Sequence, residues 1–214
     1  MLQFVTKSTD RYSVAEVAKM AMEGGCRWVQ LSGASLGEDD GALRDVATAL
    51  VPVCEQNESF LVIDDDVDLV DELKVHGVFL NDNERTSVAA AREKLGAHAI
   101  LGVRVECLEE ILALKGLDVD YVSVELKDVE ADNVSQLVER YSAIVKGVEA
   151  RGVDIHIVAR GDYSAVALAE LVKAGCAGVA VSSDIADADN PTSMTTELIE
   201  TLDKARDERD SQRV

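Results

Sequence analysis

Short apolar runs recur along the chain, and each of them ends in polar residues. The runs occupy residues 2–7, 24–33, 60–66, 76–82, 99–106, 117–126, 154–162 and 174–183. After each run, apolar residues recur every three or four positions, as in VAEVAKMAM at residues 14–22, which is the spacing of an amphipathic helix. Strands that alternate with helices predict a parallel sheet with right-handed crossovers. Eight such units predict an α/β fold of one closed (β/α)8 TIM barrel.

The apolar runs do not alternate strictly with polar residues, which is typical of strands that are covered on both faces. We therefore expect their central residues to lie in the core. These residues are Val29, Leu31, Val62, Val78, Leu80, Val122, Val124, Ile157, Val179 and Val181.

The length of 214 residues, 47% of them apolar, suits a single barrel domain covering residues 1–214. The charged segment DKARDERDSQRV, from residue 203 onward, predicts the end of a last helix and a tail. No apolar run approaches the ~20 residues of a membrane span, and MLQFVTK starts a strand instead of a signal peptide. We expect a cytoplasmic protein without a membrane partner.

The formal net charge is −20 and the isoelectric point is about 4.4. Nucleic-acid backbones are bound by clustered Lys and Arg, so this charge argues against a nucleic-acid partner. Four cysteines show no CxxC or CxxH spacing, which favours buried thiols over disulfides or a metal site. They are Cys26, Cys54, Cys107 and Cys176.

Polar residues at the C-terminal ends of the strands are the candidate site residues, because chemistry in such barrels takes place at that end. In chain order they are Thr6, Lys7, Gln30, Ser32, Asp64, Asp65, Asp66, Asn81, Asp82, Glu84, Arg104, Glu106, Ser123, Glu125, Lys127, Arg160, Gly161, Asp162, Ser182, Ser183 and Asp184. None of the three histidines lies at a strand end of this kind. We expect the histidines to be structural.

The triple aspartate at residues 64–66 is the strongest local signal among these positions. Neighbouring carboxylates repel one another unless a cation or a proton intervenes, and Mg²⁺ takes one or two carboxylates together with substrate phosphate oxygens. The same residues also precede the helical stretch VDLVDELK, where carboxylates cap the helix and favour its dipole. The local pattern alone slightly favours capping over a magnesium site.

Several ordered segments carry a resemblance to a known family. They are FVTK, EGGCRWVQL, LVIDDDVDL, HGVFLNDNE, ILGVRVECLEE, VDYVSV and AELVKAGCAGVAVSSDI followed by NPT. The chain resembles the thiamine-phosphate synthase family and the related thiazole tautomerases, which are (β/α)8 barrels. The resemblance implies that small phosphorylated molecules are the partners: hydroxyethylthiazole phosphate is joined to hydroxymethylpyrimidine pyrophosphate. Pyrophosphate leaves in a carbocation-like step assisted by Mg²⁺.

The resemblance places Gln30 against the pyrimidine and implies Asp65 and Glu84 as Mg²⁺ ligands, with Glu84 in the place of a family aspartate. The other candidate substrate-binding residues at the strand ends are Ser32, Asp64, Gly161, Ser182 and Ser183. Three strand-end residues are candidates for catalysis, namely Arg104, Glu106 and Lys127.

The chain departs from the family on the cationic side of the site. Ser32 and Ala34 stand where the family has Arg or Lys and then Lys, and Asp66 replaces an arginine. The paired glycines of the family's thiazole-phosphate site correspond here to Gly161 and Asp162. Losing one charge-assisted donor to a leaving group typically costs about a hundredfold or more in rate. We therefore expect synthase activity to be severely reduced or lost.

Three functions remain open from the sequence. The first is a divergent synthase that keeps Gln30, Asp65 and Glu84 and uses relocated cations. The candidate cations are Arg104, Arg160, Lys127 and Lys7, although we expect Arg104 and Arg160 to pair with Asp or Glu at neighbouring strand ends instead. A degenerate family member would bind another phosphorylated ligand or a protein partner instead. An isomerase built on Glu106, Glu125 and Arg104 is the third function, but a glutamate pKa near ~4.3 matches neutral pH less well than histidine. The sequence leaves open whether the chain forms a homo-oligomer.

Overall fold

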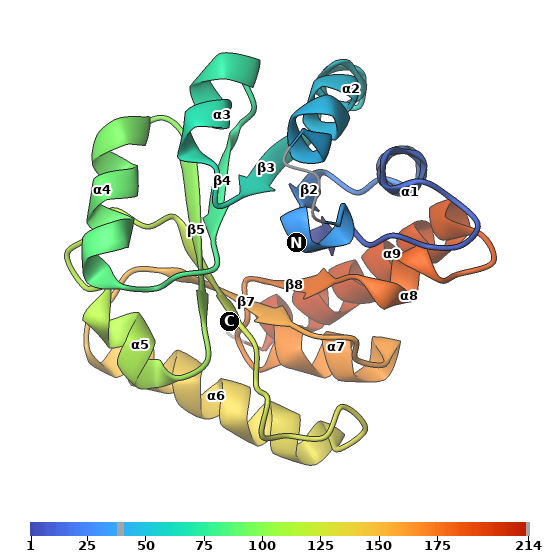
Figure 1. The fold of residues 1–214 in the computed structure, drawn as a ribbon. Helices are drawn as coiled ribbons and strands as arrows, with labels where there is room; N and C mark the ends of the chain where they lie inside the picture. Colours follow the sequence, from blue (N-terminus) through green and yellow to red (C-terminus); the bar gives the residue numbers. More distant parts are fainter. Residues whose placement is uncertain (38–40, 213–214) are drawn as a thin grey trace.

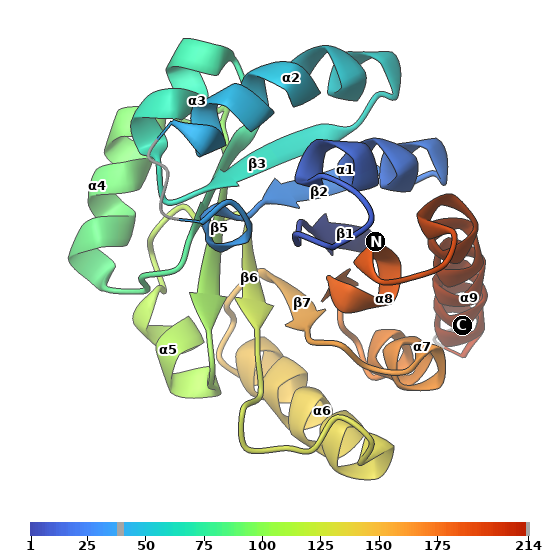
Figure 2. The same ribbon diagram turned by 45° about the vertical axis from the view of Figure 1, so that its right-hand side comes forward.

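The computed structural model describes residues 1–37 and 41–212. Eight parallel strands follow one another in chain order around a closed barrel, and the last strand pairs with the first (Figures 1 and 2). The strands are β1 (Leu2–Val5), β2 (Trp28–Leu31), β3 (Phe60–Asp64), β4 (Gly77–Leu80), β5 (Ile100–Val105), β6 (Tyr121–Val124), β7 (His156–Arg160) and β8 (Gly178–Val181). The predicted (β/α)8 barrel is confirmed.

Helices form a ring outside the strands (Figure 2). They are α1 (Val14–Glu23), the 3-10 helix η1 (Gly33–Ser35), α2 (Ala42–Gln56), α3 (Val67–Leu73), α4 (Arg85–Leu95), α5 (Leu108–Ala113), α6 (Val134–Ala150), α7 (Ala165–Lys173), α8 (Ser183–Ala186) and α9 (Pro191–Ser211). Polar side chains start several of these helices by accepting a hydrogen bond from a first-turn N–H. Ser13 does so for α1 in a reciprocal capping box with Glu16, and Asn190 does so for α9.

Two layers of apolar side chains lie on the two faces of the strands. The ten residues predicted for the core are all buried. Nine of them belong to the large cluster that includes buried helix residues, and only Val62 belongs to the small second cluster. The second cluster consists of Val5, Val62, Phe79, Tyr121, Val158 and Ala180. Because alternate residues of a strand face opposite sides, this cluster marks the face that looks into the barrel.

The inward face changes from apolar to charged along several strands. On β7, Val158 is inward, so Arg160, two positions later, also faces into the barrel. The same alternation turns Gln30 on β2 and Asp64 on β3 inward. Polar residues at the C-terminal mouth therefore converge from strands that are distant in sequence.

Tyr121 fills the barrel on the N-terminal side of that polar layer. Its hydroxyl accepts a hydrogen bond of 2.9 Å from Gln3 Nε2, and both side chains are almost completely buried. Gly102 on the neighbouring strand β5 leaves space for the ring, since a Cβ there would lie 2.3 Å from the Tyr121 Cζ atom. The side chains of Gln3 and Tyr121 thus fill the interior of the barrel below the polar layer.

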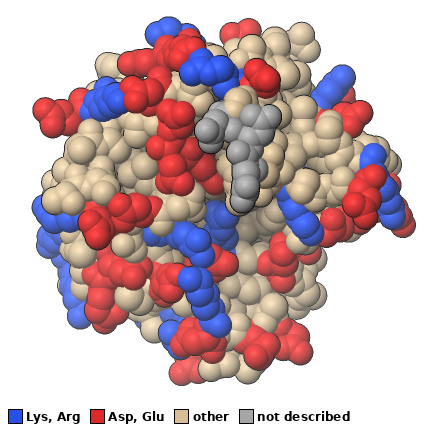
Figure 3. Space-filling view, in the orientation of Figure 1, with Lys and Arg blue, Asp and Glu red and all other residues tan. Residues whose placement is uncertain are grey.

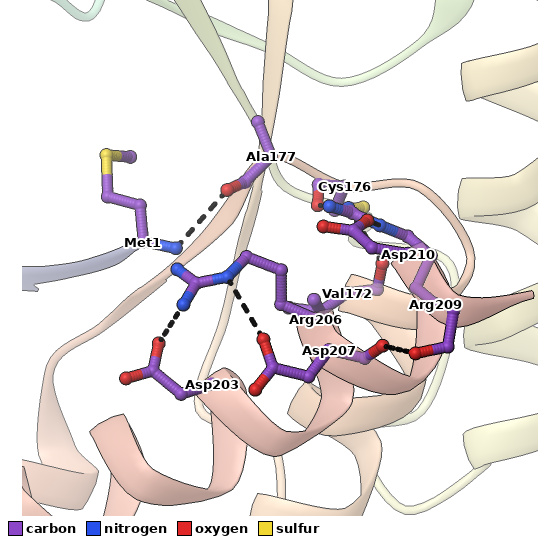
Figure 4. A network of polar contacts seen from close by, with 10 residues as sticks. Met1, Val172, Cys176, Ala177, Asp203, Arg206, Asp207, Arg209 and Asp210 are labelled. Carbon is purple, nitrogen blue, oxygen red and sulfur yellow. Dashed lines mark hydrogen bonds and ion pairs between the residues drawn. The ribbon is translucent and has the colours of Figure 1, made fainter. Parts of the chain in front are cut away.

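The long α9 lies near the N-terminus at the other side of the barrel (Figure 4). The Met1 ammonium donates to the Ala177 carbonyl at 3.3 Å, while Arg206 pairs with Asp203 at 3.1 Å. Arg209 donates to two carbonyls at the end of α7, those of Val172 and Cys176, at 3.3 Å each. The charged segment predicted from residue 203 is thus helical as far as Ser211, and residues 213–214 lie outside the described residues.

None of the helices described here is both long enough and apolar enough to span a membrane. The four cysteines are all free thiols, and three of them are buried. Burial raises the pKa of Cys26 to about 11, so this thiol stays protonated at neutral pH.

Candidate active site

A cavity of about 350 Å³ opens at the C-terminal mouth of the barrel. Residues that follow β1, β2, β6, β7 and β8 line it together with the ends of those strands. The polar lining consists of Thr6, Lys7, Ser8, Ser32, Ser35, Glu125, Arg160, Asp162 and Ser182. Chemistry in these barrels occurs at this end, so the cavity is the candidate active site.

Gln30 bridges two charged groups across the mouth. Its Nε2 atom donates to Asp64 Oδ1 at 2.6 Å, and its Oε1 atom accepts from Arg160 Nη1 at 3.3 Å. Gln30 has no exposed surface, so it supports its two partners instead of lining the cavity. Burial raises the pKa of the Asp64 carboxyl, and the hydrogen bond from Gln30 opposes that effect.

Arg160 supplies the central positive charge of the cavity. Its guanidinium carbon lies 5.4 Å from the centroid of the Phe79 ring, within the range of a cation–π contact. Burial lowers the pKa of Arg160, although Asp64 and Glu125 oppose this effect, and the group keeps its charge. Within the described part of the chain, no ion pair at 4.0 Å or less involves Arg160. The expected pairing with an acid is therefore wrong for Arg160, and its charge is available to a ligand.

The three consecutive aspartates take three different roles. Asp64 binds Gln30, while Asp66 accepts from the Leu69 N–H at 3.1 Å and caps α3. Asp65 has a left-handed φ of 56° and accepts two hydrogen bonds of 2.8 Å from Asn81, one from its N–H and one from its side chain. Capping therefore explains only one of the three carboxylates. Asp65 is turned to the end of β4, where the resemblance implies a metal.

A second and more acidic groove, of about 760 Å³, lies beside these aspartates. Its charged lining consists of Asp64, Asp65, Asp66, Asp68, Asp82 and Lys94, and Lys94 forms an ion pair with Asp68. Figure 3 shows acidic side chains gathered on this face, and basic side chains nearer its centre. This groove is strongly acidic, whereas the lining of the first cavity contains two cations, Lys7 and Arg160, and two anions, Glu125 and Asp162.

Glu84 precedes α4 at the N-cap position, and its side chain makes no capping hydrogen bond. Its backbone N–H is instead held by the Asp82 carboxylate at 2.9 Å, and that contact lowers the pKa of Asp82. Among residues 1–37 and 41–212, no three Asp, Glu, His or Cys side chains are grouped so as to hold a metal ion. A hard cation here would need oxygen atoms from a ligand, as Mg²⁺ usually does.

The three residues predicted for catalysis are engaged in ion pairs. Arg104 Nη2 lies 2.5 Å from Glu125 Oε2, so the expected pairing of Arg104 with an acid is confirmed. Lys127 pairs with Glu106, and its hydrogen bond lowers the pKa of that carboxyl. A glutamate with a lowered pKa is poorly matched to a general base at neutral pH. The cations that line the cavity are Arg160 and Lys7, and Lys7 is itself paired with Asp187.

Asp162 binds the start of α8. Its Oδ1 atom accepts from the Ser183 N–H at 3.0 Å, and its Oδ2 atom accepts from the Ser183 hydroxyl at 2.8 Å. Lys7 donates to the same hydroxyl oxygen at 3.0 Å and pairs with Asp187 at 2.5 Å. Asp162, which stands where the resemblance implies a glycine, is thus hydrogen-bonded to Ser183 at the end of the neighbouring strand.

The remaining predicted substrate-binding residues also lie at the mouth. Ser32 donates its N–H to Thr6 Oγ1 at 2.9 Å, and Ser182 donates its hydroxyl to the Val5 carbonyl at 2.9 Å. The Gly161 N–H donates to the Ala180 carbonyl at 3.2 Å. All three line the cavity, and each of these donors is already used within the protein.

Phe79 was not predicted as part of the site. Its place in the site could have been found from its position opposite Asp64 in the β3–β4 register, because that pairing puts both side chains on the inward face. The register cannot be derived from one strand alone, because it depends on how neighbouring strands align.

Comparison with known protein families shows to which family this barrel belongs. The model of the family described as "Thiamine monophosphate synthase" matches residues 2–185. The chain belongs to this family. A thiamine-phosphate synthase of Bacteroides fragilis is 31% identical over 202 residues, which cover 92% of this chain and 98% of the relative. One from Haloquadratum walsbyi is 30% identical over 202 residues, covering 90% of this chain and 86% of the relative.

Solved structures agree with this family at the level of the fold. The thiamine phosphate pyrophosphorylase of Pyrococcus furiosus superposes with a TM-score of 0.78 at 22% identity, covering 95% of this chain and 96% of that one. The orotidine 5'-phosphate decarboxylase of Pyrococcus horikoshii reaches 0.70 at 13% identity, over 95% and 99%. The family match and the curated relatives carry the functional conclusion: this is a thiamine-phosphate-synthase-like protein of thiamine biosynthesis.

Proposed function

We propose that this chain is a slow transferase that joins the methylene carbon of a pyrimidine methyl pyrophosphate to the nitrogen of a thiazole. In this reaction the carbon–oxygen bond to pyrophosphate breaks, the leaving group takes the electron pair, and a carbon–nitrogen bond forms. Family membership supports the reaction class. The single observation that carries the proposal is the half-buried Arg160, which contacts Gln30 and Phe79 and lines the cavity.

Arg160 is the residue proposed to receive the anionic substrate. Its guanidinium is oriented before any ligand enters, and a preorganised donor stabilises developing charge without reorganisation. Gln30 is a positioning residue, because it is fully buried and acts through Asp64 and Arg160. A guanidinium also offers two parallel donors to phosphate oxygens, which suits a pyrophosphate group.

Low turnover follows from the rest of the cavity. Ser32 and Ala34 line it where the resemblance implies cations, and Lys127 and Arg104 are held by Glu106 and Glu125. The same ion pairs argue against the alternative isomerase. In that enzyme Glu106 would have to accept a proton, and its hydrogen bond from Lys127 favours the ionised form at a pKa below the usual range.

Growth of a strain that lacks thiamine-phosphate synthase tests the proposal. We expect high-level expression of this protein to restore slow growth, and Arg160→Ala to abolish the rescue because it removes the oriented cation. Arg11→Ala is the matched control, since Arg11 is exposed and pairs with Asp189 outside the cavity. Absence of rescue by the unmodified protein, together with no coupled product by mass spectrometry, would refute the function.

Asp65 and Glu84 are the residues proposed to hold Mg²⁺. The metal would neutralise charge on the departing pyrophosphate when bound. The donor chemistry fits, because Asp65 is a carboxylate oriented by two hydrogen bonds from Asn81. Each carboxylate oxygen keeps a further lone pair for a cation.

Magnesium titration should show weak binding to the protein alone and tighter binding once pyrophosphate is present. The reason is that Mg²⁺ completes its coordination shell with phosphate oxygens. Calorimetry measures both affinities, and Asp65→Asn should remove the gain from pyrophosphate. Tight binding to the ligand-free protein that is unaffected by Asp65→Asn would count against these ligands.

A further inference from the structure

The ends of β7 and β8 are where barrels of this class frequently bind a phosphate group. In this chain the Asp162 carboxylate already occupies the donors at that position. It accepts the Ser183 N–H at 3.0 Å and the Ser183 hydroxyl at 2.8 Å. A carboxylate and a phosphate both present oxygen acceptors, so Asp162 makes within the protein the contacts that a bound phosphate would make.

The neighbouring donors are also engaged. The Gly161 N–H donates to the Ala180 carbonyl at 3.2 Å as part of the β7–β8 pairing. Lys7 donates to the Ser183 hydroxyl oxygen at 3.0 Å and forms an ion pair with Asp187 at 2.5 Å. A phosphate at this end would therefore have to displace contacts that the folded chain already makes.

The charge at this end opposes a phosphate as well. Lys7 is paired with Asp187, while Asp162 and Asp184 lie close enough for the charge of one to act on the other. Burial and the charge of Asp162 raise the pKa of Asp184 to about 6, which shows that added negative charge is unfavourable there. The rest of the lining is rich in hydroxyl groups, from Thr6, Ser8, Ser32, Ser35 and Ser182.

We propose that the acceptor bound in this cavity carries a free hydroxyl instead of a phosphate at the β7–β8 end, because Asp162 fills the phosphate position. Together with the proposed function, on which the identity of the heterocycle rests, this makes the acceptor an unphosphorylated hydroxyalkyl thiazole. The hydroxyl group can donate to the Asp162 carboxylate, whereas a phosphate would be repelled by it. Asp162 is then the residue that determines acceptor specificity.

Calorimetry with hydroxyethylthiazole and with its phosphate tests the inference without requiring turnover. The unmodified protein should bind the alcohol at least as tightly as the phosphate. Asp162→Gly should shift the ratio of the two affinities at least tenfold towards the phosphate, because it frees the Ser183 donors and removes a like charge. Asp162→Asn, which retains the side-chain size and loses the charge, should shift the ratio in the same direction by less. Asp189→Asn is the control, since this exposed carboxylate pairs with Arg11 and should leave the ratio unchanged.

A tenfold preference of the unmodified protein for the phosphate would overturn the inference. It would also fail if neither compound binds, or if both Asp162 variants fold, by circular dichroism, with an unaltered ratio. Binding of the alcohol without any coupling to the pyrimidine would support this inference and refute the proposed function. Slow coupling of the phosphorylated acceptor in preference to the alcohol would support the proposed function and refute this inference.

Discussion

Purified protein supplied with hydroxyethylthiazole phosphate, the pyrimidine pyrophosphate and Mg²⁺ should form thiamine phosphate at least about a hundredfold more slowly than a typical family member. The departing pyrophosphate would meet Ser32 and Ala34 in the cavity lining, and neither side chain carries a positive charge. Asp162 adds a negative charge at the other end of the same cavity. Single-turnover assays with product detection by mass spectrometry measure the rate.

Restoring the missing charge should raise that rate. We expect Ser32→Arg combined with Ala34→Lys and Asp162→Gly to increase product formation by about tenfold or more, since each recovered donor acts on the leaving group or the phosphate. The control combines Asp189→Gly, Ser211→Arg and Gln212→Lys, which change the net charge equally at exposed positions.

Turnover by the unmodified protein at the rate of a typical family member would contradict the electrostatic argument. It would mean that relocated cations serve the leaving group. Loss of that turnover in Arg104→Ala would then assign the role to Arg104, which would have to exchange Glu125 for the substrate.

Gly77→Ala should destabilise the barrel by about 3 kcal/mol or more, which corresponds to a fall in melting temperature of roughly 10 °C. A Cβ at residue 77 would lie 2.0 Å from the carbonyl oxygen of Ile100 on the neighbouring strand. A backbone atom within a closed sheet cannot move aside without disturbing the pairing of β4 with β5. Thermal unfolding followed by circular dichroism measures the change.

Gly33→Ala is the matched control for that substitution, because a Cβ at Gly33 meets no atom within 4 Å. Its melting temperature should stay close to that of the unmodified protein. Equal stability of the two variants would show that the strands around Gly77 can separate at little cost, in contradiction to the close approach of β4 and β5.

The repeated pattern of apolar runs and amphipathic stretches was sufficient to predict the strands, the helices and their closure into a barrel. Such patterns act locally, because burial of an apolar face depends on the period of the residues within one element. The same local logic placed the candidate site at the strand ends, and it correctly suggested that one of the three aspartates caps α3.

Which side chains meet at the mouth depends on closure of the barrel instead. Gln30 and Arg160 are 130 residues apart in the chain, and Gln30 forms a buried bridge between Asp64 and Arg160. The alternation within a strand indicates which residues share a face, but it does not reveal their partners on other strands.

The roles of Asp162, Lys127 and Arg104 also depend on which residues become their neighbours in the folded chain. Their charges and positions at strand ends are evident in the sequence, whereas their availability to a ligand depends on whether a partner lies within hydrogen-bonding reach in the folded chain. Asp162 meets Ser183 and Lys127 meets Glu106, each 21 residues away, because parallel neighbouring strands bring their C-terminal ends together. Residue type therefore established the chemistry available at the mouth, and the register of the closed barrel established which of those groups remain free for a substrate.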